Sequence, residues 1–186
     1  MPAGETPATI DDLYRVEGRA ELIGGKIICY EPMGCLPGSI VAEIAFRLHD
    51  FAKQQGVGVV FTGSVAYALD SPLKSGRQSF SPNTSYHTGP RPTNRMRFID
   101  GAPTFAVEVR SANDYRPAAI IRIAAKRADY FEAGTLIVWE IDPIASTIAK
   151  YRADLPTQPV NFQTGDTADA EPAVRGWKVA VDELFG

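Results

Sequence analysis

Glu108 and Arg110 are an acid and a base two positions apart in the segment TFAVEVRS. The valines beside Glu108 predict a strand, and because side chains alternate along a strand, Glu108 and Arg110 share one face. Hydrolysis of a phosphodiester needs carboxylates that hold a divalent cation, and a positive group that positions water and offsets charge in the transition state. The pair meets part of that need. The same spacing also fits an ordinary ion pair, so the chemistry depends on which residues join it.

Burial favours a chemical role for Glu108, because a buried carboxylate is unfavourable unless it is paired or bound to a metal. A second ligand is expected from a neighbouring strand, where SPNTSYH supplies Asn83 directly after a proline. On the helix that follows the Glu108 strand, Arg122 and Lys126 are four residues apart and project from one side. These residues are the candidates for a shared cleft.

The histidines and the basic loop residues carry less weight. His87 follows the Asn83 strand, whereas His49 is predicted to lie on a helix surface. With only two histidines in the chain, a zinc centre is not expected. Five basic residues either form a rim that contacts phosphates or are simply solvated. They are Lys74, Arg77, Arg91, Arg95 and Arg97.

A strand, a helix and a second strand must position the candidates, and residues 101–142 predict them in that order. The helix spans about 116–133, since Pro117 suits its first turn and Gly134 its end. The following segment, TLIVWEID, is apolar enough for a central strand, and the crossover makes the two strands parallel neighbours. The predicted packing face of the helix consists of Ile121, Ala124, Ala125, Ala128 and Phe131.

The rest of the chain predicts short elements of both kinds. Thr9 and Asp12 have the spacing of a helix cap, and Gly24-Gly25 suits a two-residue turn with positive φ. These further elements are a helix at 10–16, a hairpin around Gly24-Gly25 with Glu21 at its start, a helix at 39–55, an apolar hairpin at 57–69 and an edge hairpin at 146–165. We therefore expect one mixed α/β domain over residues 1–186.

Composition excludes several classes of protein. The chain has 186 residues, of which 45% are hydrophobic and 22% charged, as in globular rather than disordered proteins. A net charge of −3 argues against coating nucleic acid by bulk charge and leaves room for a local basic cleft. Cys29 and Cys35 are expected to be reduced thiols. The first residues lack the pattern of a signal peptide and apolar runs are strand-length, so we expect a cytoplasmic protein without a membrane anchor.

Several short motifs carry a resemblance to a known family. They are ELIGGKI, FTGS, SPNTSYH, FAVEVRSAND, the run AAKRADYFEAGTLIVWEIDP and the closing GWKVAVDELF. In this succession, over about residues 13–185, they resemble the Uma2 family (DUF820) of restriction-endonuclease-like proteins. Each motif is short and loose, and their ordered succession makes the resemblance specific.

The resemblance implies the PD-(D/E)xK nuclease fold, an α/β (α+β) architecture in which helices flank a mixed central sheet with added hairpins. It also implies an endonuclease that hydrolyses DNA with Mg²⁺ or Mn²⁺. Carried over by position, Glu21, Asn83 and Glu108 would hold the metal. Glu21 and Glu108 would serve catalysis together with Lys126, the basic residue on the helix. Arg110 occupies the older lysine position of the superfamily motif and would also serve catalysis, by pairing with the acids or with the phosphate.

Asn83 departs from the family pattern, which has Asp after the proline. An amide oxygen can coordinate a metal but carries no charge, so Mg²⁺ binding should weaken. Gly24 stands where the family often has another Asp. Two interpretations stay open: a weakened metal-dependent nuclease, or a degenerate relative that binds nucleic acid or a protein. In a third, the chain is a generic α/β binding domain in which Glu108 and Arg110 form only a buried ion pair.

The resemblance also bears on partners. DNA would be the substrate; the absence of a membrane partner is expected from the strand-length apolar runs instead. Nucleases of this fold often form dimers, for which the apolar hairpin at 57–69 offers a candidate surface. Convergence of the four carried-over positions, Glu21, Asn83, Glu108 and Lys126, on one cleft would separate the nuclease interpretations from the generic binding domain.

Overall fold

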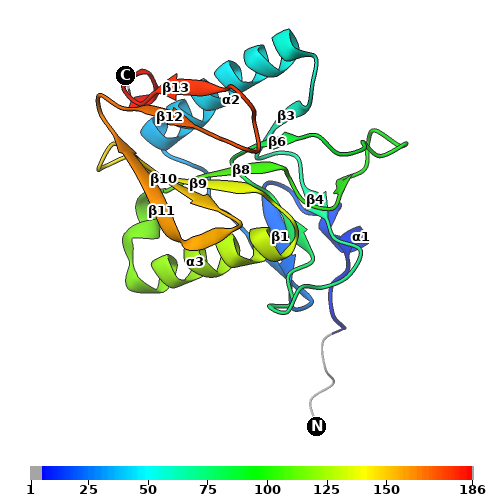
Figure 1. Ribbon diagram of the computed structural model, residues 1–186. Coiled ribbons are helices and arrows are strands. Elements are labelled where there is room, and N and C mark those ends of the chain that lie inside the picture. Colours follow the sequence, from blue (N-terminus) through cyan, green and yellow to red (C-terminus); the bar gives the residue numbers. More distant parts are fainter. Residues whose placement is uncertain (1–5, 186) are drawn as a thin grey trace.

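The computed structural model describes residues 6–185, in which a central sheet lies between two long helices. Figure 1 shows α2 on one face of the sheet and α3 on the other. The helical segments are α1 (Ile10–Leu13), α2 (Cys35–Gln55), the 3-10 turn η1 (Ala112–Tyr115), α3 (Pro117–Glu132) and α4 (Asp182–Phe185). Within residues 6–185, no helix is both long and apolar enough to span a bilayer.

The central sheet is mixed, with strand order β11-β10-β9-β8-β6-β3. Its strands are β3 (Val59–Thr62), β6 (Thr84–His87), β8 (Phe105–Val109), β9 (Ile137–Asp142), β10 (Thr147–Arg152) and β11 (Leu155–Gln163). Neighbours β8 and β9 are parallel and the other pairs are antiparallel. The expected crossover from β8 through α3 to β9 and the expected edge hairpin β10–β11 are therefore confirmed.

Within residues 6–185, three small sheets accompany the large one. The first is β1 (Ala20–Ile23) with β2 (Lys26–Cys29), the second is β5 (Ser79–Phe80), β4 (Tyr67–Ala68) and β7 (Ile99–Asp100), and the third is β12 (Thr167–Asp169) with β13 (Lys178–Ala180). The turn between β1 and β2 is the expected one, since Gly24 and Gly25 have φ of 57° and 71°. Thr9 and Asp12 form the expected capping box of α1.

The segment 57–69 does not form the expected hairpin. Strand β3 pairs with β6 at the edge of the central sheet, whereas β4 pairs with β5 and β7 in a small sheet. Alternating apolar residues predict strands but do not say which strands pair, and here the turn at residues 63–66 carries the chain from one sheet to another. A dimer through residues 57–69 stays a prediction, but the hairpin that was expected to provide its surface does not form. Helix α2 also begins four residues earlier than expected, at Cys35.

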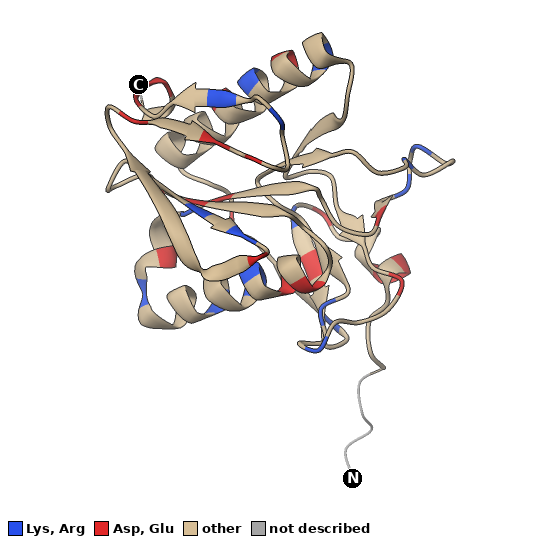
Figure 2. Cartoon of the chain, in the orientation of Figure 1, with Lys and Arg blue, Asp and Glu red and all other residues tan. Residues whose placement is uncertain are grey.

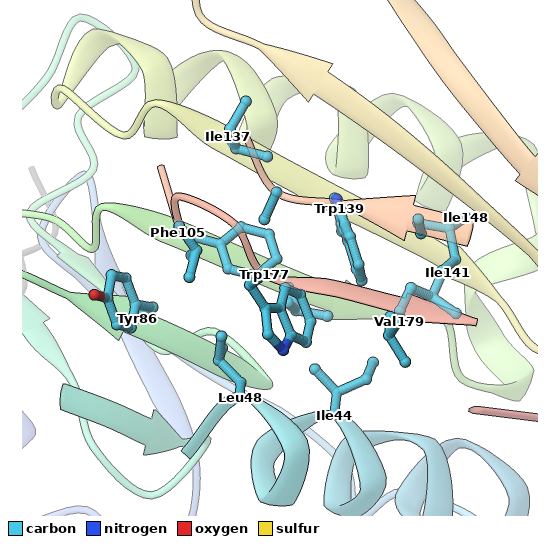
Figure 3. Packing of buried hydrophobic residues seen from close by; sticks show 14 of the residues in the cluster. Ile44, Leu48, Tyr86, Phe105, Ile137, Trp139, Ile141, Ile148, Trp177 and Val179 are labelled. Carbon is cyan, nitrogen blue, oxygen red and sulfur yellow. The ribbon is translucent and has the colours of Figure 1, made fainter. Parts of the chain in front are cut away.

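An apolar core fills the space between α2 and the sheet (Figure 3). Phe105 and Trp139 meet edge to face, with ring centroids 5.2 Å apart, and Trp177 from the C-terminal segment packs against both. Buried residues Ile40, Ile44, Leu48 and Ala52 of α2 complete this layer. Both tryptophans therefore fill core, as expected from their apolar neighbours.

The opposite face of the sheet is partly polar. The predicted packing face of α3 holds for Phe131, which packs on the apolar cluster around Tyr130, and is wrong for Ile121, Ala125 and Ala128, which are exposed. Ile121 is 71% exposed, whereas Lys126, Asp129 and Tyr130 are buried. The helix is rotated because its inward side meets carboxylates of β1 and β8, which need partners when buried. Apolar spacing along α3 therefore misidentified the side that faces the sheet.

We expect two isoleucine-to-alanine substitutions to differ sharply. Ile44→Ala should lower the free energy of unfolding by about 3 kcal/mol, because it leaves a cavity in a buried layer. Ile121→Ala should change it by less than about 0.5 kcal/mol, because the side chain is in solvent. Urea unfolding of both variants measures the contrast. A large loss for Ile121→Ala would instead support the packing face that the sequence predicted.

Candidate functional site

Lys126 lies between two carboxylates that come from distant parts of the chain. Its Nζ is 2.8 Å from Glu21 Oε1 and 2.7 Å from Glu108 Oε1. Glu21 is on β1, Glu108 on β8 and Lys126 on α3. Figure 2 shows acidic and basic segments gathered where β1 and α3 approach each other below the sheet. Three of the four carried-over positions thus converge.

Glu21 is fully buried and has a partner on each oxygen. Besides Lys126, it accepts hydrogen bonds from the Ser81 backbone N–H at 2.8 Å and from the Tyr30 hydroxyl at 2.5 Å, and it pairs with Arg77. Burial alone would raise the pKa of Glu21. The charges of Lys126 and Arg77 and these hydrogen bonds outweigh burial and bring the pKa to about 2. Glu21 is therefore ionised in the folded protein.

Arg77 is a buried bridge, and its expected place on a basic rim is wrong. The guanidinium pairs with Glu21 and lies 2.7 Å from Asp129 Oδ2 on α3. It also lies over the ring of Phe80, 5.3 Å from the centroid. Burial opposes its charge, but the two carboxylates raise the pKa of Arg77 above its ordinary value. Arg77 thus ties β1 to α3 and does not reach solvent.

Glu108 is the more accessible of the two carboxylates, with 19% of its side chain exposed. Its Oε1 accepts from Lys126 and from the Tyr130 hydroxyl at 2.6 Å, and its Oε2 lies 3.2 Å from an Arg19 nitrogen. Arg19 also donates from Nε to the Ser81 carbonyl at 2.7 Å. Both Arg19 and Ser81 line a hollow of about 130 Å³. The cluster therefore opens toward solvent on the Arg19 side.

Asn83 lies beside the cluster but binds elsewhere. Strand β6 pairs with β8 through Thr84 and Val107, and one further step in that register places Asn83 opposite Glu108. Its Oδ1 accepts from the Val109 N–H at 2.8 Å, and its Nδ2 lies 3.4 Å from Met33 Sδ. The amide is thus occupied by the end of β8 and by a thioether.

Arg110 does not join Glu108, although both were expected to point into one cleft. Its guanidinium lies 3.0 Å from Asp142 at the end of β9 and 5.8 Å from the centre of the Tyr115 ring. Arg110 follows the last residue of β8, where its long side chain reaches the neighbouring strand. His87, which was expected to approach the site, lies at the other end of β8, beyond the Tyr86–Phe105 pair, and contacts the Pro90 carbonyl through Nε2 at 3.2 Å.

Several residues that complete the cluster were missed by sequence reasoning. They are Arg19, Tyr30, Asp129 and Tyr130, together with a second ion pair between Arg127 and Glu140. One signal was available: Lys126, Asp129 and Tyr130 follow the i, i+3, i+4 spacing of a single helix face. Glu140 was also detectable, because it lies within an apolar strand and pairs in register with Glu108. Arg19 and Tyr30 carried no such pattern.

The donor groups do not fit a ready divalent-cation site. Four carboxylates face four positive groups, and each carboxylate has an ion-pair partner. The acids are Glu21, Glu108, Asp129 and Glu140, and the positive groups are Arg19, Arg77, Lys126 and Arg127. In residues 6–185, no three His, Cys, Asp or Glu side chains are grouped so that they could hold a metal ion. A hard cation such as Mg²⁺ relies on free carboxylates, which this cluster lacks.

The pKa of Glu21 makes stability depend on pH. Because that pKa is lowered from 4.5 to about 2, the contribution of ionised Glu21 is complete above pH 4.5 and is lost as pH falls toward 2. Glu21→Gln should therefore lower the free energy of unfolding by about 3 kcal/mol at pH 7, and by progressively less below pH 4.5. Exposed Glu17→Gln is the matched control and should show neither effect. Urea unfolding at pH 7, 4 and 3 tests this, and a pH-independent loss would contradict it.

Comparison with known proteins places these features in a family. The Uma2 family model, described as "Putative restriction endonuclease", matches residues 8–182. Among solved structures, the chain is similar to a protein of Anabaena variabilis described as a putative nuclease belonging to DUF820. The two share 21% sequence identity and a TM-score of 0.73 over 96% of this chain and 98% of the other, which confirms the expected fold. No protein with a curated description matches. The match over residues 8–182 shows that this chain belongs to the Uma2 family.

Proposed function

We propose that this chain is a DNA-binding member of its family, in which the endonuclease centre persists without a working divalent-cation site. The observation that carries the proposal is the position of Lys126, whose Nζ pairs with both Glu21 and Glu108. A nuclease-type acid–base cluster is thus assembled, yet its carboxylates are neutralised from within. Binding to the phosphate backbone survives such a change, whereas cation-dependent cleavage does not.

The accessible side of the cluster supports a nucleic-acid partner. Arg19 lines the hollow of about 130 Å³ described above. A second hollow, of about 340 Å³, adjoins the first, and Tyr14, Ser64 and Phe98 line both. This second hollow is lined by the arginines of the loop before β7, namely Arg91, Arg95 and Arg97. A surface with positive groups beside aromatic rings suits phosphates and bases together. Of the five basic residues proposed for a rim, Arg91, Arg95 and Arg97 line this hollow, whereas Lys74 and Arg77 do not.

The loop arginines are not equivalent. Arg97 lies 3.1 Å from Asp11 and 4.2 Å from the centre of the Tyr14 ring, so it is already engaged. Arg91 and Arg95 are exposed and have no ion pair among the described residues. They are the positive groups of this hollow that are free to contact phosphate oxygens. DNA binding should therefore depend on Arg91 and Arg95 more than on the buried cluster.

A second candidate function is the metal-dependent endonuclease that the family resemblance implies. The approach of Lys126 to Glu108 favours it, because a positive group beside a carboxylate can position water and offset charge on a phosphate. If the fold accepted Mg²⁺ or Mn²⁺, Glu21, Asn83 and Glu108 would supply the ligands that the resemblance names. The neutralised carboxylates and the amide at position 83 favour the first proposal over this one.

We expect DNA binding that weakens with salt and depends on the loop. Changing Arg91 and Arg95 together to Gln should weaken binding and lower the slope of log K against log salt by about two, one for each lost phosphate contact. Exposed Arg175, which lies in the C-terminal segment, provides the control: Arg175→Gln should leave the slope unchanged. Fluorescence anisotropy with a labelled duplex at several salt concentrations measures both. The proposal fails if the protein does not bind DNA at low salt.

Cleavage separates the two candidate functions. With Mg²⁺ or Mn²⁺, we expect the protein to nick supercoiled plasmid no faster than its Glu108→Ala variant, because the cluster lacks a free carboxylate. Gel analysis of time courses at matched protein concentration gives the rates. Cleavage well above the Glu108→Ala background would reject the first proposal in favour of the endonuclease.

A further inference from the structure

We infer that Arg19 is the resident counter-ion of Glu108, in place of a divalent cation, and that it excludes the metal from this centre. The inference rests on the proposed function, because it takes the Glu108 cluster as the nuclease-type centre. It goes further by naming one residue as the reason that the donor groups do not fit a metal. It also predicts that metal binding requires two substitutions and not the single Asn83→Asp change.

The two oxygens of Glu108 have different partners. Oε1 accepts from Lys126 and from the Tyr130 hydroxyl, both buried on α3. Among the described residues, Oε2 contacts Arg19 alone, at 3.2 Å. Oε2 is thus the atom through which Glu108 would bind a cation from outside, and a guanidinium nitrogen is already bound there.

Arg19 is held in this position from three sides. Its Nε donates to the Ser81 carbonyl at 2.7 Å, its terminal nitrogen pairs with Glu108, and its guanidinium lies 4.6 Å from the centre of the Tyr30 ring. Burial alone would lower the pKa of Arg19. The nearby carboxylates of Glu108 and Glu21 outweigh burial and raise that pKa, so the guanidinium stays positive. Such a site is built for an arginine, because it uses a planar fork and an aromatic face together.

Arg19 is also the positive group on Glu108 that can move away; Arg127, whose side chain is 16% exposed, pairs with Glu140 and not with Glu108. Its side chain is 20% exposed beside the hollow of about 130 Å³, whereas those of Lys126 and Arg77 are 11% and 6% exposed. Lys126 and Arg77 each bridge two carboxylates, so neither can move without leaving a buried charge unpaired. Competition with an incoming cation therefore falls on Arg19.

Charge balance explains why a metal does not simply join the cluster. The four carboxylates are already balanced by four positive groups, and Asn83 adds no charge. A divalent cation placed at Oε2 would meet the Arg19 guanidinium within a few ångströms, and like charges repel strongly in a partly buried site. Replacing Asn83 by Asp adds one negative charge but leaves that repulsion in place.

The test is Mn²⁺ titration by calorimetry of variants that separate charge from shape. The background is Asn83→Asp, to which Arg19→Gln or Arg19→Lys is added. Glutamine can still donate to the Ser81 carbonyl without a charge, and lysine keeps the charge. The matched control adds Arg110→Gln instead, since Arg110 makes a similar ion pair at 3.0 Å with Asp142, outside the cluster.

We expect Asn83→Asp with Arg19→Gln to bind Mn²⁺ at least tenfold more tightly than Asn83→Asp alone. Adding Arg19→Lys or Arg110→Gln should give no such gain. The inference is overturned if wild type or Asn83→Asp alone binds Mn²⁺ as tightly as the Arg19→Gln double variant. It is also overturned if adding Arg19→Lys or the Arg110→Gln control raises the Mn²⁺ affinity as much as adding Arg19→Gln. Circular dichroism and the Tm with and without Mn²⁺ check that each variant folds. If the Arg19→Gln variant does not fold, the wild-type and Asn83→Asp titrations still decide, because tight binding with Arg19 present contradicts the inference.

Failure of this inference differs from failure of the proposed function. Arg19→Gln should not abolish DNA binding, which the proposal assigns to the loop before β7. A protein that binds DNA but gains no metal affinity in the double variant would retain the function and lose the role of Arg19. A protein that gains metal affinity in the double variant but does not bind DNA would support the role of Arg19 and contradict the proposed function.

Discussion

The ammonium of Lys126, shared between Glu21 and Glu108, is the interaction on which this face of the molecule depends. Glu21 is fully buried, and without a positive partner its charge would be unfavourable by several kcal/mol. Satisfying it draws the hairpin β1–β2 and helix α3 together beneath the sheet. Arg77 repeats the connection by linking Glu21 to Asp129 on the next turn of α3. The polar cluster is therefore structural as well as a candidate site.

The two faces of the central sheet are stabilised in different ways. Between α2 and the sheet, Phe105, Trp139 and Trp177 form an apolar layer in which burial of ring surface dominates. Between α3 and the sheet, apolar contacts around Tyr130 are joined to ion pairs and hydrogen bonds. Buried charge is sensitive to the loss of any one partner, whereas an apolar layer tolerates adjustment. This difference places the specific chemistry of the chain on the α3 face.

Membership of the Uma2 family and the arrangement of the cluster carry different information about function. The family match and the shared fold identify a nuclease-type scaffold, but activity depends on the charges that the site presents. Here Arg19 pairs with the accessible oxygen of Glu108, and the amide oxygen of Asn83 accepts a hydrogen bond from the backbone at the end of β8. In the function that we propose, the scaffold is kept while the cation site is not. Arg91 and Arg95, in contrast, are exposed and form no ion pair within residues 6–185.

The sequence by itself determined the local elements and three members of the site. Gly24-Gly25 specified its turn, because positive φ is a local steric property, and the crossover between β8 and β9 followed from chain handedness. Glu108 was recognisable because it interrupts an apolar strand, and Glu21 and Lys126 came from the family resemblance. Tertiary structure decided the rest: the pairing of β3, the rotation of α3 and the contacts of Arg19. The rotation of α3 and the contacts of Arg19 depend on electrostatic neutralisation between segments up to about a hundred residues apart, and the pairing of β3 depends on which strands meet; no local pattern of hydrophobicity records either.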